Sequence, residues 1–292
     1  MHKNKNKNKN KTVGLIKIYE IFVYRLFFWL HILKNVVPLS WRTAVGIVIS
    51  FLYDIPIYLI RRQNLVMLIG GIIFLRKYKS YFYVRSMTED FYYIIPHREG
   101  VIENFILNTL GDKDIFIDVG ANIGYYTVLA AKKVGTKGAV FAIEPIAETA
   151  RILKINLKLN NIKNVIVINK AAWHRPEKIR IHTPILHGMR FYGLSTALNP
   201  ATTSIDEAVE GVTLDSLVQD SDHIKLIKID AEGVEDKVLL GAYNLLDKTS
   251  YIYIECSKKN KAKVLRILDE KGFLCKIINV PHAVHLLCKR TL

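Results

Sequence analysis

The sequence predicts an α/β fold built on a mostly parallel, seven-stranded sheet. Beyond about residue 110, short apolar runs alternate with segments of helical periodicity, a pattern typical of strands joined by crossover helices. Gly120 and Gly124 follow the first of these strands, at the edge where open α/β sheets bind ligands. The last two apolar runs are joined by a link too short for a parallel crossover, so one strand near the sheet edge must run antiparallel.

The elements expected before the glycine pair are a hairpin and a helix. Apolar runs at Ile72–Leu75 and Tyr81–Arg85 predict the hairpin, and helical spacing predicts a helix at Glu99–Leu110. The strand that ends at Asp118 comes next. Gly135 closes the following helix, Tyr125–Val134, because glycine readily adopts the left-handed conformation found at helix C-termini.

The remaining elements continue the alternation of strands and helices. A less regular insert, Trp173–Val212, interrupts it, and only Lys178–His182 within the insert predicts a strand. The other expected elements are, in order, strand Ala139–Ile143, helix Ile146–Leu159, strand Asn164–Asn169, strand Ile224–Asp230, helix Val234–Leu246, strand Tyr251–Cys256, helix Lys259–Lys271, and strands Phe273–Ile278 and Val284–Cys288.

The chain of 292 residues carries a formal charge of +16, concentrated at one end. Residues 1–80 contain 14 Lys and Arg against 2 acidic residues, a net charge of +12. Residues 81–292 contain 28 basic and 24 acidic residues, a net charge of +4. We therefore expect a disordered Lys/Asn tail at 1–12, an N-terminal helical, basic-hydrophobic extension at 13–80, and the main domain at 81–292.

Three hypotheses compete for the extension. Residues 43–60 are slightly short for a membrane-spanning helix and include Asp54 and Pro56. A cleaved signal peptide fits poorly because the polar region that would precede it is too long. A basic, aromatic segment that lies on a membrane fits better, so we expect residues 13–62 to associate with the cytoplasmic face of a membrane. The alternative is that these helices only pack on the following domain.

The three cysteines, Cys256, Cys275 and Cys288, lie in apolar runs that predict strands. They are too few for a disulfide framework, and we expect buried, reduced thiols in a cytoplasmic protein. No pair has the Cys-x-x-Cys spacing of a zinc site, and no metal is expected.

The segment Asp118–Gly124, Asp-Val-Gly-Ala-Asn-Ile-Gly, is the most informative motif. Gly120 and Gly124 let the backbone approach a ligand without a Cβ in the way. A dinucleotide-binding loop would have a further glycine, and a P-loop would have Gly-Lys-Ser/Thr. Asp118 suits the ammonium group of S-adenosyl-L-methionine, whereas it would repel a pyrophosphate. The alternative is an ordinary strand-to-helix turn.

Two further groups of carboxylates lie at predicted strand ends. Glu144 ends the second strand of the parallel sheet and can accept hydrogen bonds from both hydroxyls of a ribose, although an isolated glutamate there could be a solvated rim residue. Asp230 and Glu232 follow a later strand, where carboxylates can act as a general base or position a hydroxyl nucleophile. Glu235 is a weaker candidate, and Glu232 or Glu235 could instead pair with the following helix N-terminus.

Together these segments resemble the FkbM family of S-adenosylmethionine-dependent methyltransferases. The resemblance covers roughly residues 90–257 and rests on Phe-Ile-Asp-Val-Gly-Ala-Asn-Ile-Gly-Tyr-Tyr-Thr (116–127), Glu144-Pro145, Asn160, Val-Thr-Leu-Asp-Ser-Leu (212–217) and Ile-Lys-Ile-Asp-Ala-Glu-Gly-Val-Glu (227–235). It implies a Rossmann-like class I methyltransferase fold and methyl transfer to an oxygen, often on a sugar, glycan or glycolipid. The cofactor positions that it implies are Asp118, Gly120, Asn122, Gly124, Glu144 and Ala171.

The same resemblance bears on the acceptor side. Gly193-Leu-Ser-Thr196 is similar to the small, hydroxyl-rich substrate loop of the family. The family commonly has a histidine shortly after the glutamate that ends the fifth strand, whereas this chain has Cys256 and Ser257 after Glu255. Histidines in or near the insert, His174, His187 and His223, are further candidates for the base.

Two rival functions remain open at this stage. The charge of +16 is compatible with an RNA methyltransferase, although most of it lies in the extension. Nucleic acid is therefore not the expected partner, and the fourth strand ends in Asp-Ala-Glu-Gly rather than the Asn/Asp-Pro-Pro-aromatic element of base methylation. The second rival is a membrane-tethered protein that binds the cofactor without catalysing a reaction.

Overall fold

The computed structural model describes residues 2–61, 66–186, 189–198, 203–218, 223–280 and 283–291, without the side chains of residues 2–18, 55, 57 and 59–61. The described chain forms two compact units, Met1–Pro96 and His97–Leu292. The boundary lies at residue 96 rather than at the expected residue 80, because the predicted hairpin belongs to the first unit.

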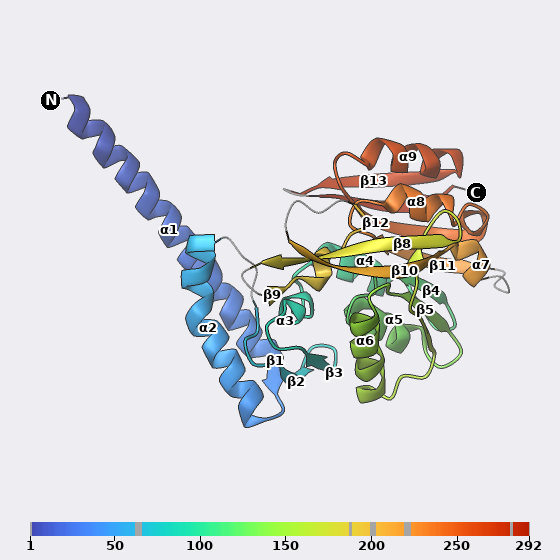
Figure 1. Cartoon of the computed structure of the whole chain (residues 1–292), viewed down its shortest axis with the longest axis horizontal. Helices are drawn as coiled ribbons and strands as arrows, with labels where there is room; N and C mark the ends of the chain where they lie inside the picture. Colours follow the sequence, from blue (N-terminus) through green and yellow to red (C-terminus); the bar gives the residue numbers. More distant parts are fainter. Residues whose placement is uncertain are drawn as a thin grey trace. The chain divides into compact units, whose positions relative to one another are not determined.

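The first unit combines two long helices with a small antiparallel sheet (Figure 1). Its sheet has the order β1-β2-β3 and includes the expected hairpin. Its elements are α1 (His2–Asn35), β1 (Val36–Pro38), α2 (Trp41–Arg61), β2 (Gly71–Leu75), β3 (Ser80–Val84) and the short α3 (Asp90–Tyr93). None of the described helices is both long enough and apolar enough to cross a membrane.

Helix α1 differs from the sequence-based expectation at its N-terminus. It begins at His2 and continues through the Lys/Asn tract, for which the sequence predicts a disordered tail. Helix growth needs little beyond an existing nucleus, and lysine is a good helix former. The apolar segment that follows supplies that nucleus, so the helix extends outward from it.

A buried ion pair joins α1 to α2. The Arg25 guanidinium donates to both carboxylate oxygens of Asp54, with an Nε–Oδ2 distance of 2.7 Å. The indole of Trp29 donates to the same carboxylate at 2.9 Å. Asp54, which breaks the apolar run of residues 43–60, is therefore the residue that fastens the two helices together.

The second unit is the predicted α/β domain. Its main sheet has the order β13-β14-β12-β11-β4-β5-β6, and β14 runs antiparallel between β12 and β13. This confirms the seven-stranded, mostly parallel sheet with one antiparallel strand near its edge. The strands are β4 (Ile115–Val119), β5 (Ala139–Ile143), β6 (Val165–Ile168), β11 (Ile224–Asp230), β12 (Thr249–Cys256), β13 (Phe273–Asn279) and β14 (Val284–Arg290).

Helices cover both faces of this sheet (Figure 1). The apolar side chains of α4 and α5 pack on the face that includes Phe116, Leu226 and Tyr253. The opposite face, with Ile227 and Ile252, packs against α8 and α9. The helices of this unit are α4 (Gly100–Thr109), α5 (Tyr125–Val134), α6 (Ala147–Leu159), α7 (Leu214–Leu217), α8 (Glu235–Leu240) and α9 (Lys261–Glu270), with 3-10 turns η1 (Tyr192–Leu194) and η2 (Leu245–Lys248).

The insert is more regular than the sequence indicated. It forms a second sheet of order β7-β10-β8-β9, from β7 (Ala171–Ala172), β8 (Glu177–Leu186), β9 (Met189–Arg190) and β10 (Ser204–Val212). Only part of β8 was predicted. The sequence of β10 has few large apolar residues because much of the strand is exposed, which hides it from hydrophobic patterning.

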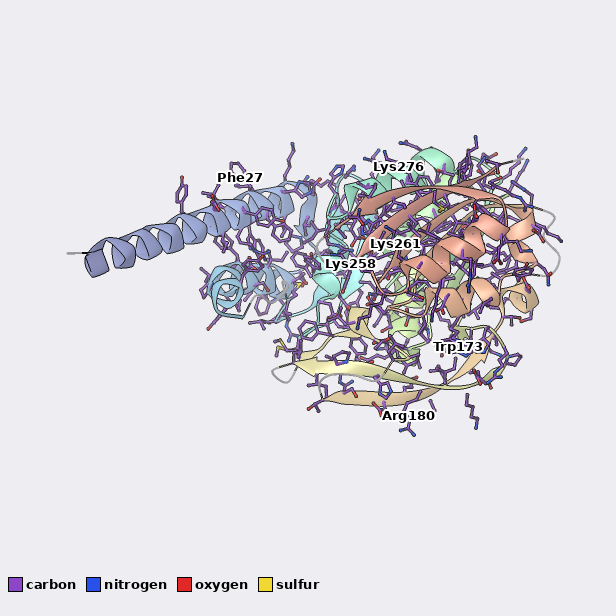
Figure 2. The ribbon with its side chains drawn as sticks, turned by 90° about the horizontal axis from the view of Figure 1, so that it is seen from above. Phe27, Trp173, Arg180, Lys258, Lys261 and Lys276 are labelled. Atoms are coloured by element: carbon purple, nitrogen blue, oxygen red, sulfur yellow. A yellow bond between two sulfur atoms is a disulfide. The ribbon has the colours of Figure 1, made fainter. Side chains whose placement is uncertain are left out.

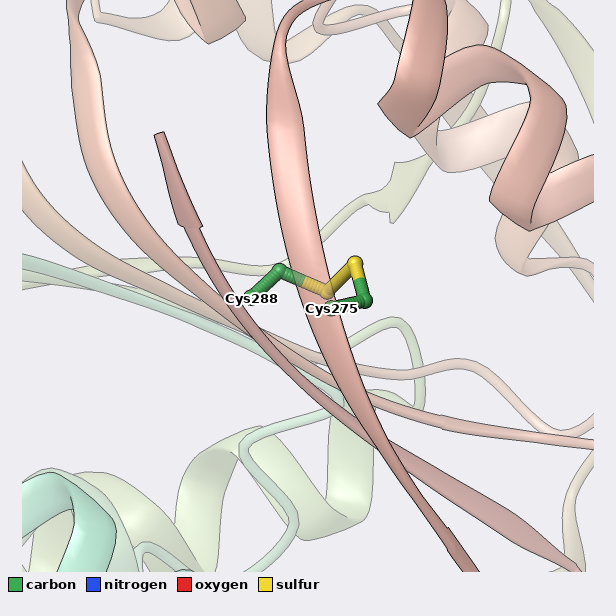
Figure 3. Close-up of a disulfide and its surroundings, with 2 residues drawn as sticks. All are labelled: Cys275 and Cys288. Atoms are coloured by element: carbon green, nitrogen blue, oxygen red, sulfur yellow. A yellow bond between two sulfur atoms is a disulfide. The ribbon is translucent and has the colours of Figure 1, made fainter. Parts of the chain in front are cut away.

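The expected reduced state of the cysteines is wrong for two of them. Cys275 of β13 and Cys288 of β14 are register partners and form a disulfide, with a Cα–Cα distance of 4.0 Å (Figure 3). Cys256 is buried and free, as expected. The number of cysteines did not predict the bond. The two side chains meet because β13 and β14 pair as a hairpin.

Breaking this bond should destabilise the edge of the sheet. We expect Cys275→Ser to lower the free energy of unfolding by about 3 kcal/mol, the chain-entropy value for a loop of this size. Denaturant titrations in non-reducing buffer measure the change, and reduced wild type is the matched control. Thiol titration of the unfolded, unreduced wild type should find only Cys256; three reactive thiols would contradict the assignment.

Candidate active site

The strand tips of the parallel sheet bring the predicted site residues to one edge. Asp118 of β4 is the register partner of Lys228 in β11, and Asp230 of β11 is the partner of Glu255 in β12. Glu144 directly follows β5, the other neighbour of β4. Parallel strands end at the same edge, so the predicted cofactor and catalytic residues gather there.

Asp118 is fully enclosed. Its carboxylate accepts hydrogen bonds from the Thr127 hydroxyl at 2.6 Å and from the Lys228 ammonium at 3.1 Å, and the residue has no exposed surface. Direct contact with a cofactor ammonium, predicted from sequence, would require this arrangement to open. The geometry instead gives Asp118 the role of holding Lys228.

Lys228 was not recognised as a site residue from the sequence. Its ammonium also donates to the carbonyl oxygen of Gly120 at 3.2 Å, so it ties the glycine loop to the centre of the sheet. Burial lowers the pKa of Lys228, but the carboxylates of Asp118 and Asp230 outweigh it and keep the pKa above its usual value. A lysine inside an otherwise apolar strand, two residues before Asp230, was the signal available in the sequence.

The two glycines are needed for packing within the protein. Gly120 has φ +72°, and a Cβ there would lie 1.9 Å from the carbonyl oxygen of Asp230. Gly124 has φ +90°, and a Cβ there would lie 2.2 Å from Leu153 Cδ1. A side chain at either position would push the loop away from its neighbours. Gly120 therefore permits the close approach that puts the loop beside Asp230.

Glu144 lies against the glycine loop. Its carboxylate accepts hydrogen bonds from the backbone N–H of Asn122 at 2.9 Å and of Ile146 at 3.0 Å. These bonds fix the carboxylate against the glycine loop. Asn122 itself has φ +50°, a conformation that asparagine tolerates better than most residues. Ala171 packs in an apolar cluster with Ile146, which lies two residues after Glu144. Ala171 is also the strand partner of Gly211 in the insert sheet.

A row of ionisable groups continues along the edge from Asp230. Glu255 is flanked by Asp230 on β11 and by His285 on β14, whose Nε2 lies 3.7 Å from Glu255 Oε2. The side chains of Asp230 and Glu255 are 34% and 29% exposed, so a solute can reach both. An imidazole from the antiparallel strand β14 thus lies beside Glu255, a relation that local sequence could not reveal.

The pKa values along this row are displaced from their usual ranges. Burial, opposed by Lys228, raises the pKa of Asp230 to about 6. Burial and the Asp230 carboxylate raise the pKa of Glu255 to about 8. Burial lowers the pKa of His285, which favours its neutral form. Burial and repulsion between the carboxylates therefore favour a proton on this pair.

One buried hydroxyl beside this row has no hydrogen-bond partner within the described part of the chain. It belongs to Tyr253, two residues before Glu255, whose ring lies 5.8 Å from the His285 ring. Burial and the carboxylates of Glu255 and Asp230 raise the pKa of Tyr253. An unpaired buried hydroxyl is costly, so it marks a position where an additional hydrogen-bonding group would be stabilised.

The turn after β11 contacts the insert. The Thr196 hydroxyl donates to the backbone oxygen of Glu232 at 2.8 Å, so the predicted substrate loop does reach this turn. Glu232 is exposed and has φ +50°. Glu235 is buried and accepts hydrogen bonds from the Gly233 N–H at 2.7 Å and from Asn260 at 2.9 Å, so it closes the turn.

Two of the three histidines proposed from sequence, His174 and His223, are described, and neither lies at this edge. His223 contacts Ser250 at the opposite ends of β11 and β12. The backbone of His174 lies beside Gly241, where α8 ends. His187 falls outside the described residues. The described residues contain no group of three or more His, Cys, Asp or Glu side chains able to hold a metal ion. A groove of about 420 Å³ lies between α4 and the amino ends of β11 and β12, away from the carboxylates.

The methyltransferase FkbM domain matches residues 118–275 of this sequence. The chain belongs to the FkbM methyltransferase family. Its seven-stranded sheet with one antiparallel strand is the class I methyltransferase fold, and the cofactor of this methyltransferase is S-adenosyl-L-methionine. No protein with a curated description matches the chain.

Several solved structures are similar in fold. A putative rRNA methylase from Clostridium thermocellum aligns with 66% of this chain and 96% of its own, at 13% identity and a TM-score of 0.45. An rRNA methylase from Streptococcus thermophilus aligns with 66% of this chain and 95% of its own, at 15% identity and a TM-score of 0.44. A putative methyltransferase from Streptococcus mutans in complex with SAH aligns with 65% and 97%, at 15% identity and a TM-score of 0.42.

The buried ion pair should be essential to this family member's stability. We expect Lys228→Met to lower the free energy of unfolding by about 3–5 kcal/mol, because it leaves the Asp118 carboxylate buried and unpaired. Lys170→Met, which removes an exposed ion pair with Glu210, should cost less than about 1 kcal/mol. In denaturant titrations the double variant Asp118→Asn/Lys228→Met should recover part of the loss; equal costs for Lys228→Met and Lys170→Met would contradict this role.

Glu144 should determine cofactor affinity. We expect Glu144→Ala to weaken binding of S-adenosylhomocysteine by about 10–100-fold, the value of hydrogen bonds to a charged group. Isothermal titration calorimetry measures this, and Glu210→Ala, on the exposed side of the insert, is the control. If Glu144→Ala binds S-adenosylhomocysteine as tightly as wild type, Glu144 does not bind the ribose.

Proposed function

We propose that this methyltransferase methylates a hydroxyl group of a sugar, on a glycan or a glycolipid, and that Asp230 is the general base. The observation that carries the proposal is the row Asp230, Glu255 and His285, which lies next to the glycine loop and keeps accessible carboxylates. Glu232, in the turn that follows Asp230, adds a fourth polar group on the acceptor side.

The residues present fit the cofactor. Glu144 offers a fixed carboxylate that can accept both ribose hydroxyls, beside a loop that Gly120, Asn122 and Gly124 shape through positive φ angles. Asp118 would hold this loop through Lys228 rather than touch the ligand. When bound, S-adenosylmethionine supplies a methyl group on a positively charged sulfur.

An alcohol becomes an effective nucleophile as it loses its proton. In the proposed step, the proton of the acceptor hydroxyl moves to the Asp230 carboxylate while the oxygen–methyl bond forms and the methyl–sulfur bond breaks. The products are a methyl ether and a neutral thioether, and Asp230 then releases its proton to solvent. Lys228, whose Nζ lies 3.9 Å from Asp230 Oδ2, favours the ionised base before the step.

The charge of the acceptor side favours a polyhydroxylated, uncharged acceptor. Carboxylates of Asp230, Glu232 and Glu255 can accept hydrogen bonds from neighbouring sugar hydroxyls, and protonated Glu255 can also donate one. The same carboxylates would repel the phosphodiesters of RNA. The basic residues that could attract RNA are concentrated in residues 1–80 instead.

Incubation of the full-length protein with labelled cofactor and separate pools of glycan, glycolipid and RNA tests the acceptor class. We expect the label in glycan or glycolipid, as a product heavier by one CH₂ and stable to alkali. Label in RNA would replace the proposal with the RNA methyltransferase hypothesis. Tight binding of the cofactor without any labelled product would favour a cofactor-binding protein without activity.

Removal of the proposed base should slow the chemical step. We expect Asp230→Asn to lower kcat by about 10²–10⁴-fold with little change in cofactor affinity. In wild type, kcat/KM should rise with pH through about 6, because Asp230 must be ionised to accept the proton. Single-turnover rates against pH measure both, with Glu210→Gln as the control. If Asp230→Asn keeps the single-turnover rate and the pH dependence of wild type, Asp230 is not the base.

Glu255 should lower stability at alkaline pH. Its pKa in the folded protein, about 8, exceeds the ordinary value of 4.5, so the folded state loses stability as pH rises from about 4.5 to above 8. We expect Glu255→Gln to melt at the same temperature as wild type at pH 5 and at least about 3 °C higher at pH 9. Thermal melts at both pH values measure this. The same difference in melting temperature between the two proteins at pH 5 and at pH 9 would contradict the shifted pKa.

A further inference from the structure

The helices of the first unit carry apolar side chains that no other part of the described chain covers. On α1 these side chains recur at intervals of three or four residues and so form one stripe along the helix. The stripe consists of Tyr19, Phe22, Leu26, Leu30 and Leu33, which are between 37% and 68% exposed. Phe27, 66% exposed, projects beside this stripe on the side of α1 away from α2 (Figure 2).

Helix α2 has the same organisation. Trp41, Val45, Val48 and Leu52 follow one another at spacings of four and three residues and are between 40% and 77% exposed. The opposite face of α2 is buried and includes Thr43, Ile47, Ser50 and Asp54. Each helix is therefore fixed by one face and presents a separate apolar stripe to its surroundings.

The charged groups that are buried between α1 and α2 are paired with each other. Arg25 and Asp54 neutralise each other, and Trp29 donates its N–H to the same carboxylate. The Arg25 guanidinium also lies over the rings of Phe28 and Tyr58, at 4.6 and 4.8 Å. The helix pair therefore exposes apolar stripes without an unpaired buried charge.

Positive charge accompanies these stripes. Residues 1–19 contain no acidic residue and include Lys3, Lys5, Lys7, Lys9, Lys11 and Lys17. Clustered lysines next to an amphipathic helix are attracted to anionic lipids, and tryptophan at a helix end is favoured at the boundary between lipid and water.

We propose that α1 and α2 form a docking surface for an anionic lipid bilayer, on which both helices lie in the plane of the interface. The stripes enter the boundary between headgroups and acyl chains, and the lysines of residues 3–17 contact anionic headgroups. The proposal does not depend on the acceptor of the methyl group, although it would bring the enzyme close to acceptors carried on lipids.

Co-sedimentation of the full chain with vesicles tests this proposal. The vesicles are phosphatidylcholine with 30% phosphatidylserine, and phosphatidylcholine alone. We expect binding to the anionic vesicles that is at least about tenfold stronger than to the neutral ones, and that weakens at high salt. Replacement of Lys3, Lys5, Lys7, Lys9 and Lys11 by Gln should remove most of the preference for anionic vesicles.

A matched pair of triple variants tests whether vesicle binding depends on the α1 stripe or on exposed apolar residues in general. Leu26→Ser/Leu30→Ser/Leu33→Ser should lower the vesicle affinity by at least about tenfold. Ile166→Ser/Leu240→Ser/Leu274→Ser, which changes comparably exposed residues of the second unit, should bind as wild type. Equal binding by both triple variants, or no binding of wild type, would overturn the proposal. So would a wild-type dimer that ignores vesicles and that the stripe variant converts to a monomer.

Discussion

The buried pair of Lys228 and Asp118 is the interaction on which the site depends. It joins the two central strands of the parallel sheet side by side, and the lysine continues to the carbonyl oxygen of Gly120. The loop after β4 is also held by the N–H groups of Gly120 and Ala121, which donate to the carbonyl oxygen of Ile143 at the end of β5. The missing side chain of Gly120 permits its close approach to Asp230. A charge placed in the core thus adds one of the bonds that position the glycine loop.

In the proposed arrangement, the acceptor side is organised differently from the cofactor side. Around the glycine loop, Glu144 accepts two backbone N–H groups and Asp118 is enclosed. At the ends of β11 and β12, the carboxylates of Asp230 and Glu255 remain accessible, crowded and displaced in pKa, and the Tyr253 hydroxyl beside them has no partner within the described part of the chain. Rigid positioning on one side and unsatisfied polarity on the other is the distribution expected where one ligand is held and another is changed.

Most of the main sheet and the helices beside it could be predicted because these segments have a clear local pattern of apolar residues. The ranges of α5, β5 and β11 coincide with the predicted segments, since each is a short, periodic run with clear ends. Features that depend on distant residues could not be predicted. The role of Lys228 depends on its partner Asp118, and that of His285 depends on its partner Glu255. Strand β10 is likewise recognisable only from its pairing with β8. For Asp118 the sequence indicated a functional position but not its enclosure, because burial is set by α5 and β11 together.

The antiparallel strand β14 makes the site sensitive to alignment. Side chains of a strand alternate between the two faces of a sheet, so a shift of one position would turn His285 toward α8 and α9 and leave Glu255 beside an aliphatic neighbour. Because the bond between Cys275 and Cys288 joins β13 to β14, these two strands keep one pairing and can shift along β12 only as a unit. The place of His285 beside Glu255 therefore depends on how this linked hairpin pairs with β12.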